Sequence, residues 1–172
     1  MDILVTAEAG AAQGQISWAK NSHPCALGRG GIAAFKSEGD GITPAGRFAL
    51  RNLLYRPDRQ TCPITSLQIT EITPDMGWSD DPADAKNYNK RIMRPYAGSH
   101  EVLWRTDAVY DFVVPLGYND SPAIAGNGSA IFLHLARPGF LPTAGCVAVE
   151  KAVMLALLAD ITAQTFMTIA VV

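Results

Sequence analysis

Residues 131–150, IFLHLARPGFLPTAGCVAVE, place a histidine and a cysteine on a strand-like segment and the loop that follows it. In a strand, successive side chains point to opposite faces of the sheet. The alternation divides the first five side chains into two sets: Ile131, Leu133 and Leu135 on one face, Phe132 and His134 on the other. The stretch therefore predicts a buried strand with His134 on the same face as an aromatic ring.

The loop after this strand returns the chain to Gly145 and Cys146, just before a helical pattern. A cysteine at a helix N-terminus has its thiolate stabilised by unpaired N–H groups and by the helix dipole, and the same groups can hold an oxyanion. On this interpretation Cys146 is a nucleophile and His134 is its base. The alternative is that both are core residues, since a single histidine on a strand more often is one.

The rest of the chain predicts a mainly β fold, because short strand-like segments alternate with clusters of Gly, Pro and Asp. Such spacing favours a sandwich or barrel over β-α-β units. Helical patterns occupy residues 80–93, which open with acidic residues and Pro82, and residues 149–161, where apolar residues recur at helical spacing. The strand-like segments are residues 2–7, 15–20, 47–55, 66–72, 110–118 and 165–172.

Length and composition favour a single domain, residues 1–172, with neither nucleic acid nor a membrane span. The chain is 48% hydrophobic and 17% charged, which indicates a compact globule, and its formal net charge is −2. It has no cationic stripe suited to a phosphate backbone, and no apolar run approaches the roughly 20 residues of a membrane span. The start lacks a signal-peptide pattern, so the sequence allows either a cytoplasmic protein or an exported domain whose signal has been replaced.

The three cysteines have no CxxC spacing, which argues against a zinc site or a disulfide framework. At least one thiol should be free, and a bridge between Cys25 and Cys62 is left open for an exported protein. Three acidic residues gather at the start of the first helical pattern, where the helix dipole stabilises them: Asp80, Asp81 and Asp84. We therefore expect no metal and no other cofactor.

Two motifs resemble those of the YkuD-type L,D-transpeptidase catalytic domain. Residues 134–148, HLARPGFLPTAGCVA, resemble the family's signature of a histidine, a loop and then Ser/Thr-His-Gly-Cys. Upstream, residues 38–48, EGDGITPAGRF, are similar to a family turn that is commonly Lys-Thr-Pro-x-Gly-x-Phe. The resemblance spans nearly the whole chain. It implies a YkuD-like β-sandwich or open barrel with one or two short helices, one of them following the catalytic cysteine.

The resemblance also implies roles for individual residues. Cys146 matches the nucleophile, His134 the general base, and Thr143 the Ser/Thr of the signature, which we place with substrate binding. In the family, the backbone around the Gly-Cys pair forms the oxyanion hole and the carbonyl after the base orients the imidazole. Those roles fall to Gly145 with Cys146, and to Leu135.

The chain departs from the family pattern around this signature. The loop between histidine and cysteine is shorter, the usual second histidine is Ala144, and the usual Arg or Asn after the cysteine is Ala148. Arg137, three positions past the base, is a candidate for binding a stem carboxylate, and Tyr118 is a candidate groove residue. His100 is the alternative base, although it lies outside the motif.

The resemblance implies a periplasmic acyltransferase, an L,D-transpeptidase that cross-links peptidoglycan stem peptides through a thioester. Donor and acceptor are both stem peptides, and we expect a monomer. The altered motif is similar to a divergent proteobacterial branch associated with 1,3 cross-links, whose acyl donor is the first-position L-alanine, whereas typical members make 3,3 cross-links. Two alternatives stand beside it: an L,D-carboxypeptidase or other peptidoglycan hydrolase with the same site, and a non-catalytic cell-wall-binding domain.

Overall fold

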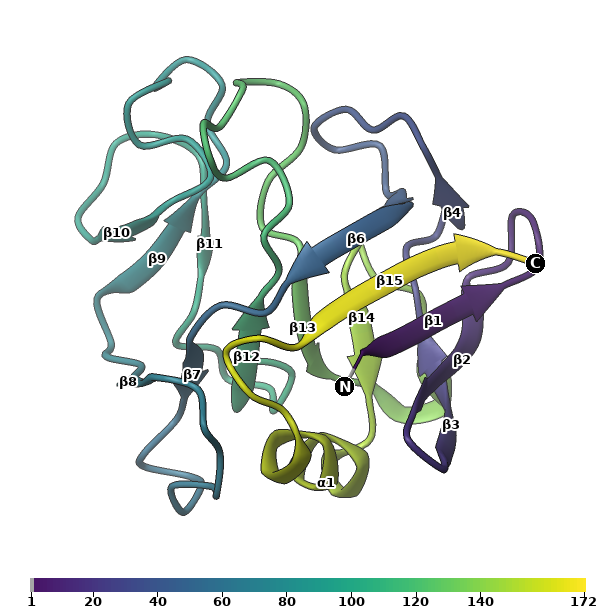
Figure 1. The fold of residues 1–172 in the computed structure, drawn as a ribbon. Helices are drawn as coiled ribbons and strands as arrows, with labels where there is room; N and C mark the ends of the chain where they lie inside the picture. The colour runs from purple at the N-terminus through teal and green to yellow at the C-terminus, as the bar shows by residue number, and fades with distance from the viewer. Residues whose placement is uncertain (1) are drawn as a thin grey trace.

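Over residues 2–172, the fold is built around a ten-stranded mixed sheet, with one α-helix and two smaller sheets (Figure 1). The computed structural model describes residues 2–172. The strands of the large sheet follow the order β6-β15-β1-β2-β3-β14-β13-β12-β7-β8, and a three-stranded sheet follows the order β10-β9-β11. The elements are β1 (Ile3–Ala7), β2 (Gln13–Trp18), β3 (Asn21–Ala26), β4 (Ile32–Ala33), β5 (Thr43–Pro44), β6 (Gly46–Ala49), β7 (Leu53–Tyr55), β8 (Ile69–Glu71), β9 (Met76–Ser79), β10 (Arg91–Met93), β11 (His100–Val102), β12 (Phe112–Pro115), β13 (Phe132–Leu135), the 3-10 helix η1 (Pro138–Phe140), β14 (Val147–Val149), α1 (Lys151–Asp160) and β15 (Phe166–Val171).

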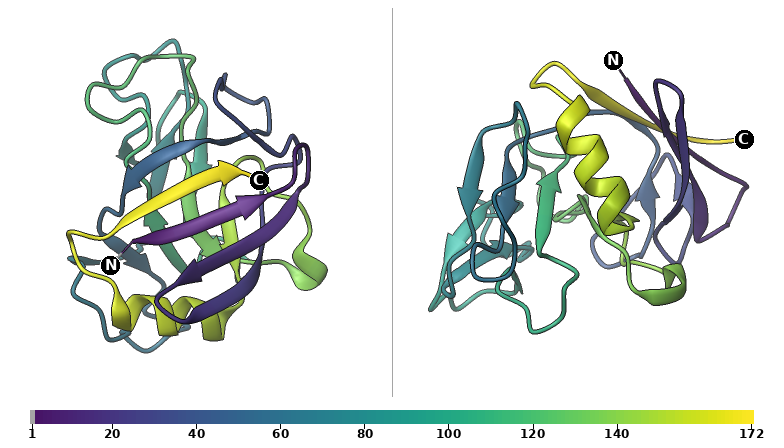
Figure 2. Two further views of the ribbon diagram at one scale, coloured as in Figure 1. Left: turned by 45° about the vertical axis from the view of Figure 1, so that its right-hand side comes forward. Right: turned by 90° about the horizontal axis from the view of Figure 1, so that it is seen from below.

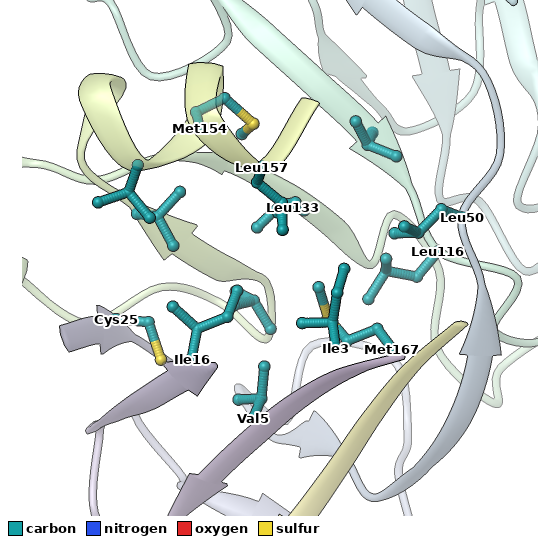
Figure 3. Close-up of a cluster of buried hydrophobic side chains, with 14 of the residues drawn as sticks. Ile3, Val5, Ile16, Cys25, Leu50, Leu116, Leu133, Met154, Leu157 and Met167 are labelled. Atoms are coloured by element: carbon teal, nitrogen blue, oxygen red, sulfur yellow. The ribbon is translucent and has the colours of Figure 1, made fainter. Parts of the chain in front are cut away.

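The large sheet curls so that its two halves face each other across the main hydrophobic core, and α1 closes one end (Figure 2). Ile3 and Ile16, from β1 and β2, face Leu133 of β13 in this core, while Met154 and Leu157 enter it from α1 (Figure 3). All five side chains are fully buried. The expected mainly β, YkuD-like fold is therefore confirmed, and it takes the form of a curled sheet.

Strand β13 lies in the middle of this sheet, paired on both sides. It runs parallel to β14, with His134 opposite Ala148, and antiparallel to β12, with His134 opposite Val113. The predicted alternation is confirmed: the side chains of Leu133 and Leu135 pack in the main core, whereas Phe132 packs in a second hydrophobic cluster on the other face. His134 shares the face of Phe132, so its side chain points away from the main core.

The second cluster lies between the large sheet and the three-stranded sheet. It includes Phe132 from β13, Met76 from β9, Cys146 from the turn before β14 and Tyr110 from the loop before β12. Trp78 of β9 packs edge-on against the ring of Phe132, with the ring centroids 5.1 Å apart. The face of β13 that carries His134 is therefore covered by protein, and the cavity described below opens beside this cluster.

The helix predicted over residues 80–93 is wrong. The segment consists of turns followed by β10, and its acidic residues cap those turns: Asp81 Oδ1 accepts the Ala83 amide at 2.9 Å, and Asp84 Oδ1 accepts the Asn87 amide at 3.3 Å. Asn89 adopts φ of +56°, which a right-handed helix does not allow. Short polar side chains that bond nearby amides give the backbone an alternative to a helix.

The other expected elements are largely confirmed. The helix predicted over residues 149–161 is α1, although Val149 belongs instead to β14 and Glu150 is the N-cap. The strand predicted over residues 47–55 is broken into β6 and β7, and Leu50 between them forms an isolated bridge with Leu116. All three cysteines are free, so the bridge between Cys25 and Cys62 that the sequence left open is not formed. Among residues 2–172, no helix has the length and apolar character needed to span a membrane.

Candidate active site

Cys146 lies in the turn before β14, packed against the second hydrophobic cluster. Its Sγ accepts a hydrogen bond from the Phe132 amide at 3.3 Å, and the thiol donates to the Ala130 carbonyl at 3.2 Å. Burial is the main cause that raises the pKa of the thiol to about 12. The prediction that Cys146 lies at a helix N-terminus is wrong, because β14 separates it from α1. The resting group is therefore a buried thiol that needs a base.

His134 is fixed in one orientation by the backbone. Its Nδ1 lies 2.9 Å from the carbonyl oxygen of Leu135, and because a carbonyl can only accept, Nδ1 carries the proton. Nε2 is then the unprotonated nitrogen that can take a proton. Burial is the main cause that lowers the pKa of His134 to about 4, so the imidazole is neutral at pH 7.

The two residues come from one strand of a parallel pair and from the turn before the other. His134 is opposite Ala148, and Ala148 lines the same cavity as His134 and as Cys146, which lies two residues before Ala148 in the turn that leads into β14. Both residues line a single cavity of about 600 Å³. A neutral imidazole and a thiol at one cavity wall are the parts of a base and nucleophile pair.

The turn that carries Cys146 is held by Thr143. The Thr143 hydroxyl accepts the Gly145 amide at 3.1 Å and donates to the Cys146 carbonyl at 2.7 Å. Gly145 has φ of +140°, and a Cβ atom added there would lie 2.7 Å from the carbonyl oxygen of Ile42. Only glycine fits this backbone without strain. Thr143 thus closes the turn and also lines the cavity.

The upstream motif folds against the same turn. Lys36 Nζ pairs with Asp40 Oδ1 at 2.7 Å, and Asp40 also accepts the amides of Ser37 and Ile42. This closed loop brings the Ile42 carbonyl against Gly145. The two motifs that were recognised about 90 residues apart in the sequence therefore meet at the cysteine.

The cavity wall carries charges of both signs. Its lining includes the cationic residues Arg29, Lys36, Arg105 and Arg137 and the acidic residues Glu38, Asp80 and Glu101. The ring of Tyr110 lies edge-on to His134, with centroids 5.4 Å apart, and its hydroxyl donates to Glu101 at 3.2 Å. Burial, aided by the charge of Asp80, raises the pKa of Glu101. Asp80 Oδ1 is itself buried and has no hydrogen-bond partner within residues 2–172.

The structure brings together most of the residues that the sequence proposed. His134, Arg137, Thr143 and Cys146 line the cavity, and Gly145 shapes the turn beside it. Within residues 2–172, no group of three or more His, Cys, Asp or Glu side chains has the arrangement of a metal site.

Two proposed residues lie elsewhere. Tyr118 is not part of the cavity lining; it packs against Phe48 and donates its hydroxyl to the Asn127 carbonyl at 2.6 Å. His100, the alternative base, lies on β11 outside the lining, with Nδ1 2.8 Å from the Gly98 carbonyl.

The cavity residues that sequence reasoning missed include Lys36, Glu101 and Tyr110. Lys36 stands two positions before the upstream motif, so its place in the chain was the available signal. Glu101 and Tyr110 come from β11 and the following loop, and nothing in their local sequence indicates that these segments fold over β13.

Comparison with known proteins gives one match. The family model described as YkuD, L,D-transpeptidase catalytic domain, matches residues 12–171, which is nearly the whole chain. Neither the curated proteins nor the solved structures contain a significant match. The matched range includes the histidine, the cysteine and the upstream loop that meet at the cavity.

Proposed function

Because the chain belongs to the YkuD family of L,D-transpeptidase catalytic domains, which act on peptidoglycan stem peptides, we propose that it cross-links these stems through a thioester on Cys146. The observation that carries this proposal is that His134 on β13 and Cys146, in the turn before the neighbouring β14, line one cavity. The Leu135 carbonyl supports the assignment of the base, since it holds the tautomer whose Nε2 is free to accept a proton.

The first half of the reaction is acylation of the cysteine. The thiol turns its hydrogen from the Ala130 carbonyl toward His134, and Nε2 takes the proton as Sγ attacks a stem carbonyl carbon. A C–S bond forms and the negative charge moves to the carbonyl oxygen. When the tetrahedral intermediate collapses, the C–N bond breaks and the imidazolium returns its proton to the leaving amine.

The second half transfers the acyl group to an amine of another stem. Neutral His134 takes a proton from the attacking amine, an amide bond forms, and the thiolate leaves and is reprotonated. The charges of the cavity suit both stems: Arg29, Arg105 and Arg137 suit the carboxylates, while Asp80 and Glu101 suit an ammonium group. Attack by water in place of the amine makes the same site a carboxypeptidase or hydrolase.

The bond attacked is proposed to be that after the first-position L-alanine, which gives 1,3 cross-links. The support is the altered signature, with Ala144 and Ala148, and the short loop between the histidine and the cysteine. This loop contains η1, and Leu141 and Pro142 after it line the cavity. Proline fixes its own φ, so the loop gives the cavity a stiff rim. The family acts on the cell wall, generally outside the cytoplasm, and we place this chain in the periplasm.

The experiment is incubation of purified protein with isolated peptidoglycan, followed by digestion and mass spectrometry of the muropeptides. We expect new dimers with the mass and fragmentation of 1,3 cross-links, which disappear in Cys146→Ala and persist in Cys62→Ala. Only 3,3 dimers would contradict the bond assignment. Shortened stems without dimers would identify a hydrolase, and unchanged peptidoglycan would support a non-catalytic binding domain.

A further inference from the structure

The backbone of the cysteine turn gives an oxyanion little help. The Gly145 amide, which the family resemblance implies as an oxyanion donor, is engaged by the Thr143 hydroxyl at 3.1 Å. Of the two amides of the Gly-Cys pair, the Cys146 amide then remains as a donor to the oxyanion. An oxyanion is normally stabilised by two or more fixed donors, each of which contributes about 10²-fold or more to the rate. This arrangement needs a further positive group.

Lys36 is a buried cation at this turn. Its side chain is only 2% exposed. A Cβ atom added to Gly145 would lie 3.4 Å from Lys36 Nζ, and one added to Gly128 would lie 2.7 Å from Lys36 Cε. The aliphatic part of the lysine thus passes over Gly128, and its ammonium group ends beside the turn that carries the nucleophile. Lys36 also lines the cavity that Cys146 lines.

The ammonium group is held in place by Asp40, whose own position is fixed. Asp40 accepts the amides of Ser37 and Ile42 at 2.6 Å and 2.8 Å, and pairs with Lys36 at 2.7 Å. An ammonium group carries three donors; Asp40 takes one and the Ser37 carbonyl, 3.5 Å from Nζ, takes a second, which leaves one for a substrate oxygen. The charge of Lys36 also acts on Cys146, where it opposes the effect of burial by lowering the pKa of the thiol.

We propose that Lys36 is a catalytic residue whose ammonium group donates to the carbonyl oxygen of the acyl donor and stabilises the negative charge on it during acylation and deacylation. This inference rests on the proposed cysteine chemistry of the same cavity. The step moves no additional proton: the oxygen gains charge as the C–S bond forms and loses it when the C–N bond breaks. A fixed ammonium in a buried site needs little reorganisation when that charge appears.

The test compares two reactions of Cys146 in a Cys62→Ser background, because Cys62 is exposed. Acylation by p-nitrophenyl acetate develops an oxyanion, whereas alkylation by iodoacetamide attacks a saturated carbon and develops none. We expect Lys36→Met to slow acylation about 100-fold and to change alkylation less than fivefold. Lys36→Arg should restore most of the acylation rate. Lys20→Met, at the turn between β2 and β3, is the matched control and should change neither.

Lys36→Met leaves Asp40 without its cation, which can disturb the loop. The double variant Lys36→Met/Asp40→Asn removes both charges and keeps a side-chain oxygen for one of the two amides, since Ser37 donates to Oδ2 of Asp40 and Ile42 donates to Oδ1. We expect the same loss of acylation in this variant. Acylation within threefold of the parent, or an equal loss of acylation and alkylation, would overturn the proposal. Since p-nitrophenyl acetate needs no stem-peptide recognition, this readout stands even if the parent does not act on peptidoglycan.

Discussion

His134 is a buried base that stays neutral over an unusually wide pH range. Burial lowers its pKa to about 4, against about 6.5 for an exposed imidazole, because the surroundings disfavour the charged form. The same burial raises the pKa of Cys146 to about 12. At neutral pH the pair is therefore an imidazole and a thiol, so the sulfur becomes nucleophilic only as its proton moves to His134 during attack.

The pH dependence of the acylation rate should reflect the low pKa of His134. Since the active form has neutral His134, we expect the rate to fall as the pH drops through about 4, and to be nearly level from pH 6 to 8. Stopped-flow measurement of acylation between pH 3.5 and 8 checks this, with circular dichroism as the control for folding. A half-maximal rate near pH 6.5 would show instead that the imidazole is accessible to water in the working enzyme.

The same residue links stability to pH. The folded-state pKa lies below the unfolded value, so the unfolded chain binds the proton more readily. The contribution of His134 is fully present above pH 6.5 and is lost as the pH falls toward 4. The shift corresponds to a loss of about 3 kcal/mol in the free energy of unfolding. The circular dichroism control above therefore has to be recorded at each pH.

Among the structural elements, the geometry of the site depends on close packing of three segments: the loop that contains Asp40, the segment around Ala130, and the turn at Gly145. Ala130 adopts φ of +52°, and its amide donates to the Asn89 side chain at 3.0 Å. Its carbonyl accepts the thiol hydrogen of Cys146. The geometry at the nucleophile is therefore set by segments that lie far apart in the chain.

The substitution Gly145→Ala tests whether these segments pack closely at Gly145. The new Cβ atom would lie 2.7 Å from the Ile42 carbonyl oxygen at a φ of +140°, so we expect a loss of roughly 2–4 kcal/mol in the free energy of unfolding. Urea denaturation measures the loss, and acylation should fall with it because the turn must move. Gly139→Ala is the matched control: its φ is +72°, but the new atom meets nothing within 4 Å. A cost at Gly145 no larger than that at Gly139 would refute the close packing.

The elements also show what the sequence could predict. The period-two alternation in β13 predicted which face would carry His134, because successive side chains of a strand point to opposite faces even when both faces are buried. The prediction of a helix over residues 80–93 was wrong because its acidic side chains accept hydrogen bonds from nearby amides and so stabilise turns. Glu101 could not be assigned to the site, since its place there comes from contacts between segments that are distant in sequence, whereas Lys36 had a signal in its position next to the upstream motif.

In the whole molecule, the curled sheet keeps the main hydrophobic core on one side and the candidate active site on the other. The main core and α1 occupy one face of β13, and the candidate active site occupies the other. The central strand is thus held by pairing on both sides and by packing on its core face, while its other face presents His134 to the cavity. Rigid elements position functional groups more precisely than loops do, which suits a base that has to reach a nucleophile in the turn before the next strand.

During the proposed reaction, Cys146 carries an acyl group taken from a stem peptide. The most direct measurement is the intact mass of the Cys62→Ser protein, quenched in acid shortly after mixing with a stem peptide, with peptide mapping of the adduct. We predict an increase equal to the donor acyl group, located on Cys146 and absent from Cys146→Ala, and a strongly reduced adduct in His134→Gln. The absence of an adduct under turnover conditions in which cross-links form, or an adduct on another residue, would contradict a thioester on Cys146.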